Sequence, residues 1–287
     1  MKGDVLDDDG TPKDPNGLAY MNPDEWRELV NRAEREADMA LNDAPVAGVL
    51  GSDVERKPVR WIWKGRLARG EMTILDGDPG LGKSTMLCDL AARITTGRPL
   101  PGEEKPPRDG AGGVVLVTTE DSPSPTVRPR LDAAGADVGR VRIVPTVPTR
   151  GDDGGERVPK LPEDLDVLKA TCRDVNADLL VIDPLLAHLS GEINTFKDGD
   201  VRSALAPVQT FAEEAELALV VVRHLTKASA GANPLYRGQA SIGIIGAARL
   251  ALACWEPENT PRAEVIFEQA AGAGLWANDL LLSTFCP

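Results

Sequence analysis

The sequence predicts an α/β fold in which a parallel sheet is covered by helices on both faces. Short, almost wholly apolar runs alternate with segments whose apolar residues recur at helical spacing. Strands that are apolar throughout are typical of a sheet buried on both sides. The 287 residues, 42% hydrophobic and 27% charged, suffice for a substantial core. Extended segments are predicted at 59–63, 72–76, 114–118, 179–183, 218–222, 249–254 and 264–267, and helices after residue 82 up to Gly97, at 163–175 and at 200–216.

The N-terminal part differs from the rest of the chain in composition. Residues 1–57 hold 14 acidic and 7 basic residues, within a formal net charge of −13 for the whole chain. Residues 1–20, rich in Asp, Gly and Pro, predict disorder. An apolar stripe at helical spacing predicts a helix over 23–41, and the Pro and Gly of 42–57 predict a linker. We therefore expect an acidic tail, a helix and a linker before one domain over 58–287.

Composition and charge exclude several classes of protein. No apolar run approaches the roughly 18 to 20 residues of a membrane span, and the acidic N-terminus lacks the apolar stretch of a secretory signal. The four cysteines lie far apart without a CxxC pair. This spacing disfavours a zinc site or a disulfide framework and favours reduced thiols in the cytoplasm. Because the chain is acidic, any contact with nucleic acid needs a local basic feature, such as a loop or a ring pore.

The strongest motif is the glycine-rich segment GDPGLGKS, which fits G-x-x-x-x-G-K-[ST]. It lies between an apolar strand and an amphipathic helix, which a chance glycine-rich turn would not require. The glycines let backbone N–H groups face a phosphate, and the helix N-terminus adds positive potential. Lys83 can reach the β- and γ-phosphates of ATP, and the Ser84 hydroxyl can bind Mg²⁺. The predicted nucleotide-binding residues are Gly77, Asp78, Pro79, Gly80, Leu81, Gly82, Lys83, Ser84 and Thr85.

Two acidic positions follow apolar strands. Asp183 ends the run LLVID, where parallel sheets bind ligands, and it could hold the hydration shell of Mg²⁺. Its alternative role is to cap the turn before Pro184. Glu120, with Asp121 beside it, follows the run at 114–118 and could polarise the water that attacks the γ-phosphate. The alternative for Glu120 is an exposed acidic loop.

His224 and Arg249 occupy the ends of two other predicted strands. His224 follows the run at 218–222 and could hydrogen-bond the γ-phosphate and report its loss; alternatively, backbone groups satisfy it. Arg249 begins the run at 249–254 and could be an arginine finger in a neighbour's site, or form a surface salt bridge. The other histidine, His188, is predicted to be structural.

The stretch between Lys227 and Ser241 contains small residues, Arg237 and no acidic residue. A flexible, locally basic loop with one aromatic residue suits single-stranded nucleic acid. A solvated loop without a ligand is the alternative.

The order of these motifs resembles the RecA-like ATPases related to the plasmid replicative helicase RepA, whose bacterial and phage relatives are labelled AAA-family ATPases. The resemblance covers roughly residues 59–255. The segments that carry it are WIWKGRLARGEMTILDGDPGLGKST, VVLVTTEDSP, DLLVIDPLLAHL, VVVRHLTK and YRGQASIGIIGAARLAL.

The resemblance implies a ring, usually a hexamer, with ATP between subunits and single-stranded DNA in the pore. The predicted helix at 23–41 more loosely resembles segments that pack on a neighbouring subunit. The implied roles are binding of ATP and Mg²⁺ by Lys83 and Ser84, catalysis by Glu120, metal binding by Asp183, γ-phosphate sensing by His224, a trans-acting finger at Arg249, and proximity to the DNA-binding loop for Arg237. The C-terminal stretch departs from the family pattern after about Gln269, and we expect a truncation or frameshift there, which the downstream coding DNA would reveal.

Three functions compete at this point. The first is an ATP-hydrolysing motor in DNA repair or replication. The second is an ATP-binding switch that loads or regulates other proteins without unwinding DNA. The third is a monomeric small-molecule kinase, which ranks last because no arginine-rich lid segment is visible.

Overall fold

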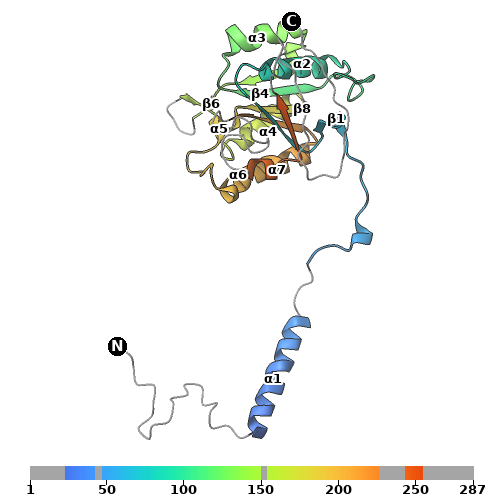
Figure 1. Cartoon of the computed structure of the whole chain (residues 1–287), viewed down its shortest axis with the longest axis vertical. Coiled ribbons are helices and arrows are strands. Elements are labelled where there is room, and N and C mark those ends of the chain that lie inside the picture. The colour runs from blue at the N-terminus through green and yellow to red at the C-terminus, as the bar shows by residue number, and fades with distance from the viewer. Residues whose placement is uncertain (1–22, 43–46, 150–153, 226–242, 255–287) are drawn as a thin grey trace, which may run out of the picture. The chain divides into compact units, whose positions relative to one another are not determined.

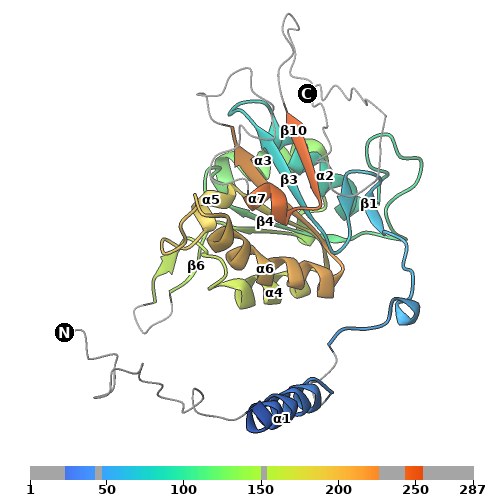
Figure 2. The same ribbon diagram turned by 60° about the horizontal axis from the view of Figure 1, so that its bottom comes forward.

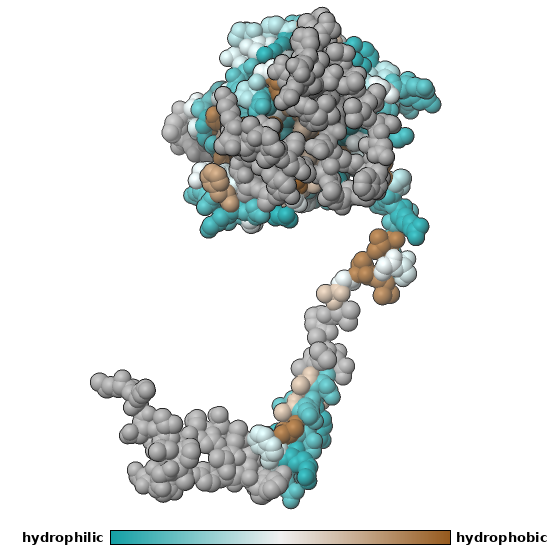
Figure 3. All heavy atoms as spheres, in the orientation of Figure 1, coloured by the Kyte–Doolittle hydropathy of each residue, from teal (hydrophilic) through white to brown (hydrophobic). Residues whose placement is uncertain are grey.

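The computed structural model describes residues 23–42, 47–149, 154–225 and 243–254. The chain divides into two compact units, Met1–Lys57 and Pro58–Pro287. In the first unit, helix α1 (Pro23–Asn42) and the short 3₁₀ turn η2 (Gly51–Asp53) are the elements described (Figure 1). Large apolar side chains around η2 are exposed, and Figure 3 shows this segment in brown.

The second unit is built on a six-stranded sheet, and all neighbouring strands in it are parallel. The strand order is β10-β3-β9-β8-β4-β5. The strands are β3 (Met72–Gly77), β4 (Gly113–Thr118), β5 (Val141–Val144), β8 (Ala177–Asp183), β9 (Ala218–His224) and β10 (Leu250–Cys254). The predicted α/β fold with a parallel sheet is therefore confirmed.

Helices cover both faces of this sheet (Figures 1 and 2). One face packs against α2 (Lys83–Thr96) and α3 (Arg128–Ala134). The other face packs against α4 (Leu165–Asp174), α6 (Asp198–Ala215) and α7 (Gly243–Ala247), with the short α5 (Leu185–His188) beside them. Helix α2 ends as predicted, because Gly97 takes a left-handed φ of 66°.

Several smaller elements were not predicted from the sequence. The edge strand β5 is the most important of them, because it completes the sheet. The others are β2 (Leu67–Ala68), the pair β6 (Val147–Pro148) and β7 (Glu156–Arg157), the π-helical turn η3 (Pro123–Val127), the 3₁₀ turn η4 (Val138–Arg140), α3, α5 and α7. Strand β2 pairs antiparallel with β1 (Trp61–Trp63), which lies within the extended segment predicted at 59–63. The predicted strand at 264–267 and the predicted disorder of 1–20 lie outside the described residues.

Within the described part of the chain, none of the helices combines the length and apolarity that crossing a bilayer requires.

Alternation along the central strands decides which side chains face α2. In β8, Leu179 and Val181 belong to the core on the α2 face, while Leu180 and Ile182 belong to the opposite core. With a period of two, the next residue on the α2 face is Asp183. The same period places His224, at the end of β9, on the α2 face. Polar side chains from separate strands therefore project toward the N-terminus of one helix.

Candidate nucleotide-binding site

The glycine-rich segment forms a tight loop between β3 and α2. Gly80 and Gly82 have φ values of 85° and 78°, a left-handed conformation that residues with a Cβ seldom adopt. A Cβ on Gly77 would lie 2.9 Å from the carbonyl oxygen of Cys254, at the end of the neighbouring β10. Glycine is thus required at Gly77 by close packing and at the other two positions by backbone conformation.

Lys83, the first residue of α2, folds back into this loop. Its Nζ donates hydrogen bonds to the carbonyl oxygens of Gly77 at 2.7 Å and Asp78 at 2.9 Å. The residue is only 6% exposed. Burial lowers the pKa of Lys83, while nearby groups that include Asp183 and Glu120 act in the opposite direction. A buried ammonium group is therefore held within the loop by hydrogen bonds to two backbone carbonyl oxygens.

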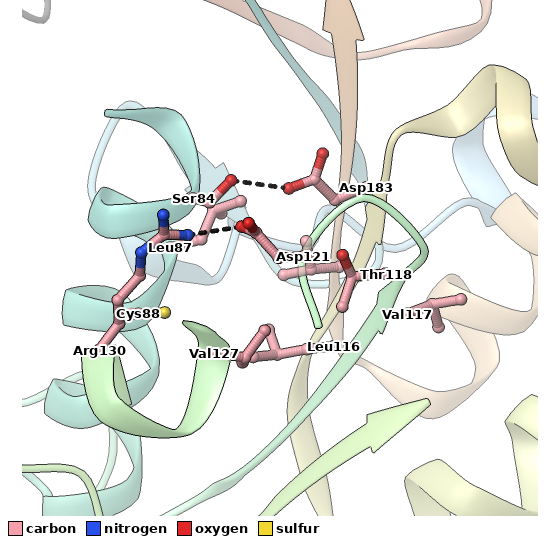
Figure 4. Close-up of a pocket in the computed structure, with 11 residues that line it drawn as sticks. Ser84, Leu87, Cys88, Leu116, Val117, Thr118, Asp121, Val127, Arg130 and Asp183 are labelled. Atoms are coloured by element: carbon pink, nitrogen blue, oxygen red, sulfur yellow. Dashed lines mark hydrogen bonds and ion pairs between the residues drawn. The ribbon is translucent and has the colours of Figure 1, made fainter. Parts of the chain in front are cut away.

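Ser84 and Asp183 meet at the start of α2. The Ser84 hydroxyl donates a hydrogen bond to Oδ2 of Asp183 at 3.1 Å (Figure 4). Burial raises the pKa of Asp183, whereas this hydrogen bond and the nearby Lys83 and His224 lower it. A buried carboxylate in this setting gains stability from a cation. The two oxygen ligands fit Mg²⁺, which prefers hard oxygen donors.

Glu120 and His224 also come together, although they follow different strands. The two carboxylate oxygens of Glu120 lie 3.1 and 3.2 Å from Nε2 of His224. The strand β8 separates β4 from β9 in the sheet, so the pair spans the carboxyl end of β8 above Asp183. The Glu120 side chain remains 54% exposed and that of His224 is 19% exposed. This arrangement leaves the carboxylate accessible beside the metal ligand.

A cavity begins at Ser84 and Asp183 and extends between α2, β4 and α3 (Figure 4). Its lining includes Ser84, Asp183, Asp121 and Arg130 above an apolar floor. Nη1 of Arg130 donates to Oδ2 of Asp121 at 2.5 Å, which ties the turn after β4 to α3. The sequence had not suggested Arg130. Nothing in the local sequence points to Arg130, because an arginine in a proline-containing segment gives no indication of its ion-pair partner.

The other predicted site residues lie elsewhere. Arg249 is exposed and precedes β10, at the end of the sheet opposite to the loop; its backbone N–H donates to the Met72 carbonyl at 3.0 Å. The Arg249 guanidinium acts to lower the pKa of Glu71, although burial raises that pKa overall. Lys227 and Arg237 lie outside the described residues. Pro79 and Thr85 are exposed, and Leu81 packs against the core on the α2 face.

His188 is fully buried in α5, and its Nδ1 donates to the carbonyl of Pro159 at 3.0 Å. Burial lowers the pKa of His188. A neutral imidazole in this position ties α5 to the segment that precedes α4.

A parallel sheet with this glycine-rich loop, a lysine inside it and an acidic residue at the end of a nearby strand defines a RecA-like P-loop ATPase. The comparison with family models gives the particular family. The chain belongs to the AAA domain family, whose model matches residues 36–230.

Among individual proteins, the chain is similar to bacterial proteins named DNA repair protein RadA. The RadA of Streptococcus pneumoniae is 22% identical over 203 residues, which cover 70% of this chain and 41% of that protein. The RadA of Halalkalibacterium halodurans is 23% identical over 184 residues, 63% of this chain and 34% of that protein. The RadA of Mycobacterium tuberculosis is 25% identical over 172 residues, 59% of this chain and 30% of that protein.

The chain thus spans less than half the length of these curated relatives. The matches support the RecA-like class that the sequence motifs predict. The finer relationship to the RepA helicase stays a prediction.

Proposed function

We propose that this chain is an ATP-hydrolysing RecA-like motor that acts on DNA in repair or replication. One observation carries the proposal: Lys83, Ser84, Asp183, Glu120 and His224, from four separate elements, converge at the carboxyl ends of the central strands. Such a constellation suits phosphoryl transfer, in which catalysis is mainly positioning and electrostatic stabilisation.

Within this proposal, the loop and Lys83 bind the triphosphate. The backbone N–H groups of the loop and the start of α2 favour an anion, and Lys83 exchanges the Gly77 and Asp78 carbonyls for phosphate oxygens. This exchange gains free energy because the ammonium is already desolvated. Ser84 and Asp183 would hold Mg²⁺. When bound, the ion supplies positive charge to the phosphate oxygens.

Glu120 is proposed to orient the attacking water and to accept its proton. Its exposed carboxylate stands beside Asp183, and its hydrogen bond with His224 fixes its direction. His224 is proposed to sense the γ-phosphate, because a hydrogen bond from its ring to the phosphate would compete with its hydrogen bond to Glu120. The chain can thereby couple the state of the nucleotide to the position of the catalytic carboxylate.

A homo-oligomeric ring, with a hexamer as the expected form, is part of the proposal. Arg249 is exposed and lies at the opposite end of the sheet from its own loop, so it suits a site on a neighbouring copy. Contact with single-stranded DNA through Lys227 and Arg237 is also proposed. The relatives named DNA repair protein RadA support the link to DNA repair.

The test is a titration of the ATPase rate with a single-stranded oligonucleotide, beside a sizing experiment with and without nucleotide. We expect Lys83-dependent turnover that DNA stimulates and a nucleotide-dependent oligomer. Turnover that is unchanged in Lys83→Ala would contradict the proposal.

An ATP-dependent regulatory or loading switch is the second candidate. The net charge of −13 favours it, because the chain as a whole repels a polyanion. The same titration separates the two candidates: tight ATP binding with slow turnover that DNA does not affect supports the switch.

A further inference from the structure

A buried ion pair lies behind the candidate site, on the face of the sheet that carries α6 and α7. Arg223 of β9 donates to both carboxylate oxygens of Asp76 of β3, with Nε to Oδ1 at 2.8 Å and Nη2 to Oδ2 at 2.6 Å. The Arg223 side chain is 1% exposed and that of Asp76 is 4% exposed. Both charges are therefore taken out of water and satisfied by each other in a bidentate geometry.

The position of this pair in the sheet links it to two parts of the site. Asp76 and Arg223 face each other in the parallel register of β3 and β9, and the next pair in that register is Gly77 with His224. Gly77 supplies the carbonyl that accepts from Lys83, and His224 contacts Glu120. The ion pair thus lies one residue before the two points at which β3 and β9 enter the site.

Stability alone gives little reason for such a pair. Removing two charges from water costs several kcal/mol per ion, and well-packed apolar residues of similar volume are often as stabilising as a buried ion pair. The preceding residue in each strand is apolar and buried, Leu75 at 1% exposure and Val222 at 0%, so apolar side chains at 76 and 223 would continue these apolar runs. What the pair adds is direction, because a bidentate contact fixes both side chains and the strand ends that carry them.

We propose that Asp76 and Arg223 are positioning residues for ATP hydrolysis, which fix His224, and through it Glu120, relative to the loop that holds Lys83. This inference rests on the proposed function. Neither residue contacts the nucleotide. A displacement of about 1 Å at a reacting group can lower a rate by about a hundredfold. Loss of the pair is therefore expected to reduce kcat while leaving ATP binding nearly unchanged.

The experiment compares an apolar replacement of the pair with a matched change at the other end of the sheet. The variant Asp76→Leu/Arg223→Met removes both charges together, so that no unpaired charge is left in the core. The variant Arg223→Lys keeps the charge but loses the bidentate contact. The control is Asp178→Asn, which disturbs another buried carboxylate bound by arginine, at the amino end of β8. Wild type and Lys83→Ala are measured beside them in the full chain.

For the double variant we expect unchanged cooperative thermal unfolding, an ATP-analogue Kd within about threefold of wild type, and a kcat lower by about tenfold to a hundredfold. We expect the kcat of Arg223→Lys to lie between that of wild type and that of the double variant. Asp178→Asn should keep the wild-type kcat even if it unfolds at a lower temperature. A double variant with wild-type kcat, or a loss of kcat matched by an equal loss of nucleotide binding, would overturn the inference.

A second readout does not depend on turnover. Amide hydrogen exchange at the ends of β3 and β9 is expected to become at least about tenfold faster in the double variant and unchanged in the control, since exchange reports local opening. If wild type shows no Lys83-dependent turnover, the proposed function is wrong, and exchange still decides whether the pair fixes these strand ends. If exchange at these strand ends and kcat are both unchanged in the double variant, the positioning role is wrong while the proposed function still stands.

Discussion

The two ends of strand β8 carry buried carboxylates in opposite surroundings. Asp178, at the amino end, accepts hydrogen bonds from Arg69 at 2.8 Å and from Arg108 at 3.2 and 3.3 Å. Asp183, at the carboxyl end, accepts from the Ser84 hydroxyl. Among the residues that the structure describes, no lysine or arginine lies within ion-pair distance of Asp183. One charge is neutralised within the protein, and the other is left for a ligand.

The physical difference explains which end can bind a ligand. Around Asp178 the packing is closed: a Cβ on Gly112 would lie 1.9 Å from its Oδ2. Asp183 instead lines a cavity with Ser84 and Asp121. A buried carboxylate without a counterion costs stability, and burial raises the pKa of Asp183 accordingly. A protein retains such a cost at a functional site more readily than in its framework.

The largest expected effect is at Lys83. Lys83→Ala removes the ammonium from the loop, and we expect ATP turnover to fall below detection and nucleotide affinity to fall with it. Turnover and the Kd of a fluorescent ATP analogue measure the two effects. The exposed Lys105→Ala is the control and should match wild type.

Arg249→Ala tests whether a residue at the opposite end of the sheet serves a neighbour's site. We expect turnover to fall by about 10³-fold with ATP binding kept, because a finger acts in the transition state. Mixing Arg249→Ala subunits with Lys83→Ala subunits should restore part of the activity, since each supplies what the other lacks. Equal losses of binding and turnover would instead place Arg249 in its own site or in the fold.

Glu120→Gln keeps the shape of the side chain and removes its charge. We expect turnover to fall by about 10²-fold or more, with ATP-analogue binding unchanged, because a general base acts only in the chemical step. Glu104→Gln, at an exposed position, is the control. A wild-type rate in Glu120→Gln would show that another group activates the water.

The smallest effect is on stability, and it should have opposite signs at the two ends of β8. Asp178→Asn removes the charge that two partly exposed arginines bind and is expected to cost about 2 kcal/mol in the free energy of unfolding, with kcat unchanged. Because the pKa of Asp183 is raised in the folded state, its ionised form destabilises the fold at neutral pH. Asp183→Asn should therefore unfold at equal or higher urea concentration while losing turnover. A lower urea midpoint would contradict this comparison.

Local patterns were sufficient for the central part of the fold. The strand β3, the loop and α2 are contiguous in the chain, and each was predicted from apolar spacing or from the glycine pattern. The strand β5 was missed because its four residues are only partly buried and include the exposed Arg142. The region of η3 and α3 was missed because its prolines obscure helical periodicity.

The candidate site could be predicted residue by residue, but its internal contacts could not. The positions of Glu120 and His224 after apolar strands suggested functional roles. Their hydrogen bond depends on the order of β4, β8 and β9, which a single sequence does not show. The Asp76–Arg223 pair is a similar case, because it joins residues far apart in the chain. The sequence offered one indication of this pair, which is that Asp76 and Arg223 are charged residues near the ends of two apolar strands.

The sequence by itself determined the class of fold and the phosphate-binding loop, because strand burial, helical periodicity and glycine conformation are local properties of the chain. Only the tertiary structure decided which charges face one another. It pairs Asp178 with arginines, sets Asp76 against Arg223 and, among the described residues, gives the Asp183 carboxylate the Ser84 hydroxyl as its hydrogen-bond donor. The reason is physical: partners are assigned by the order and register of parallel strands, which long-range packing fixes.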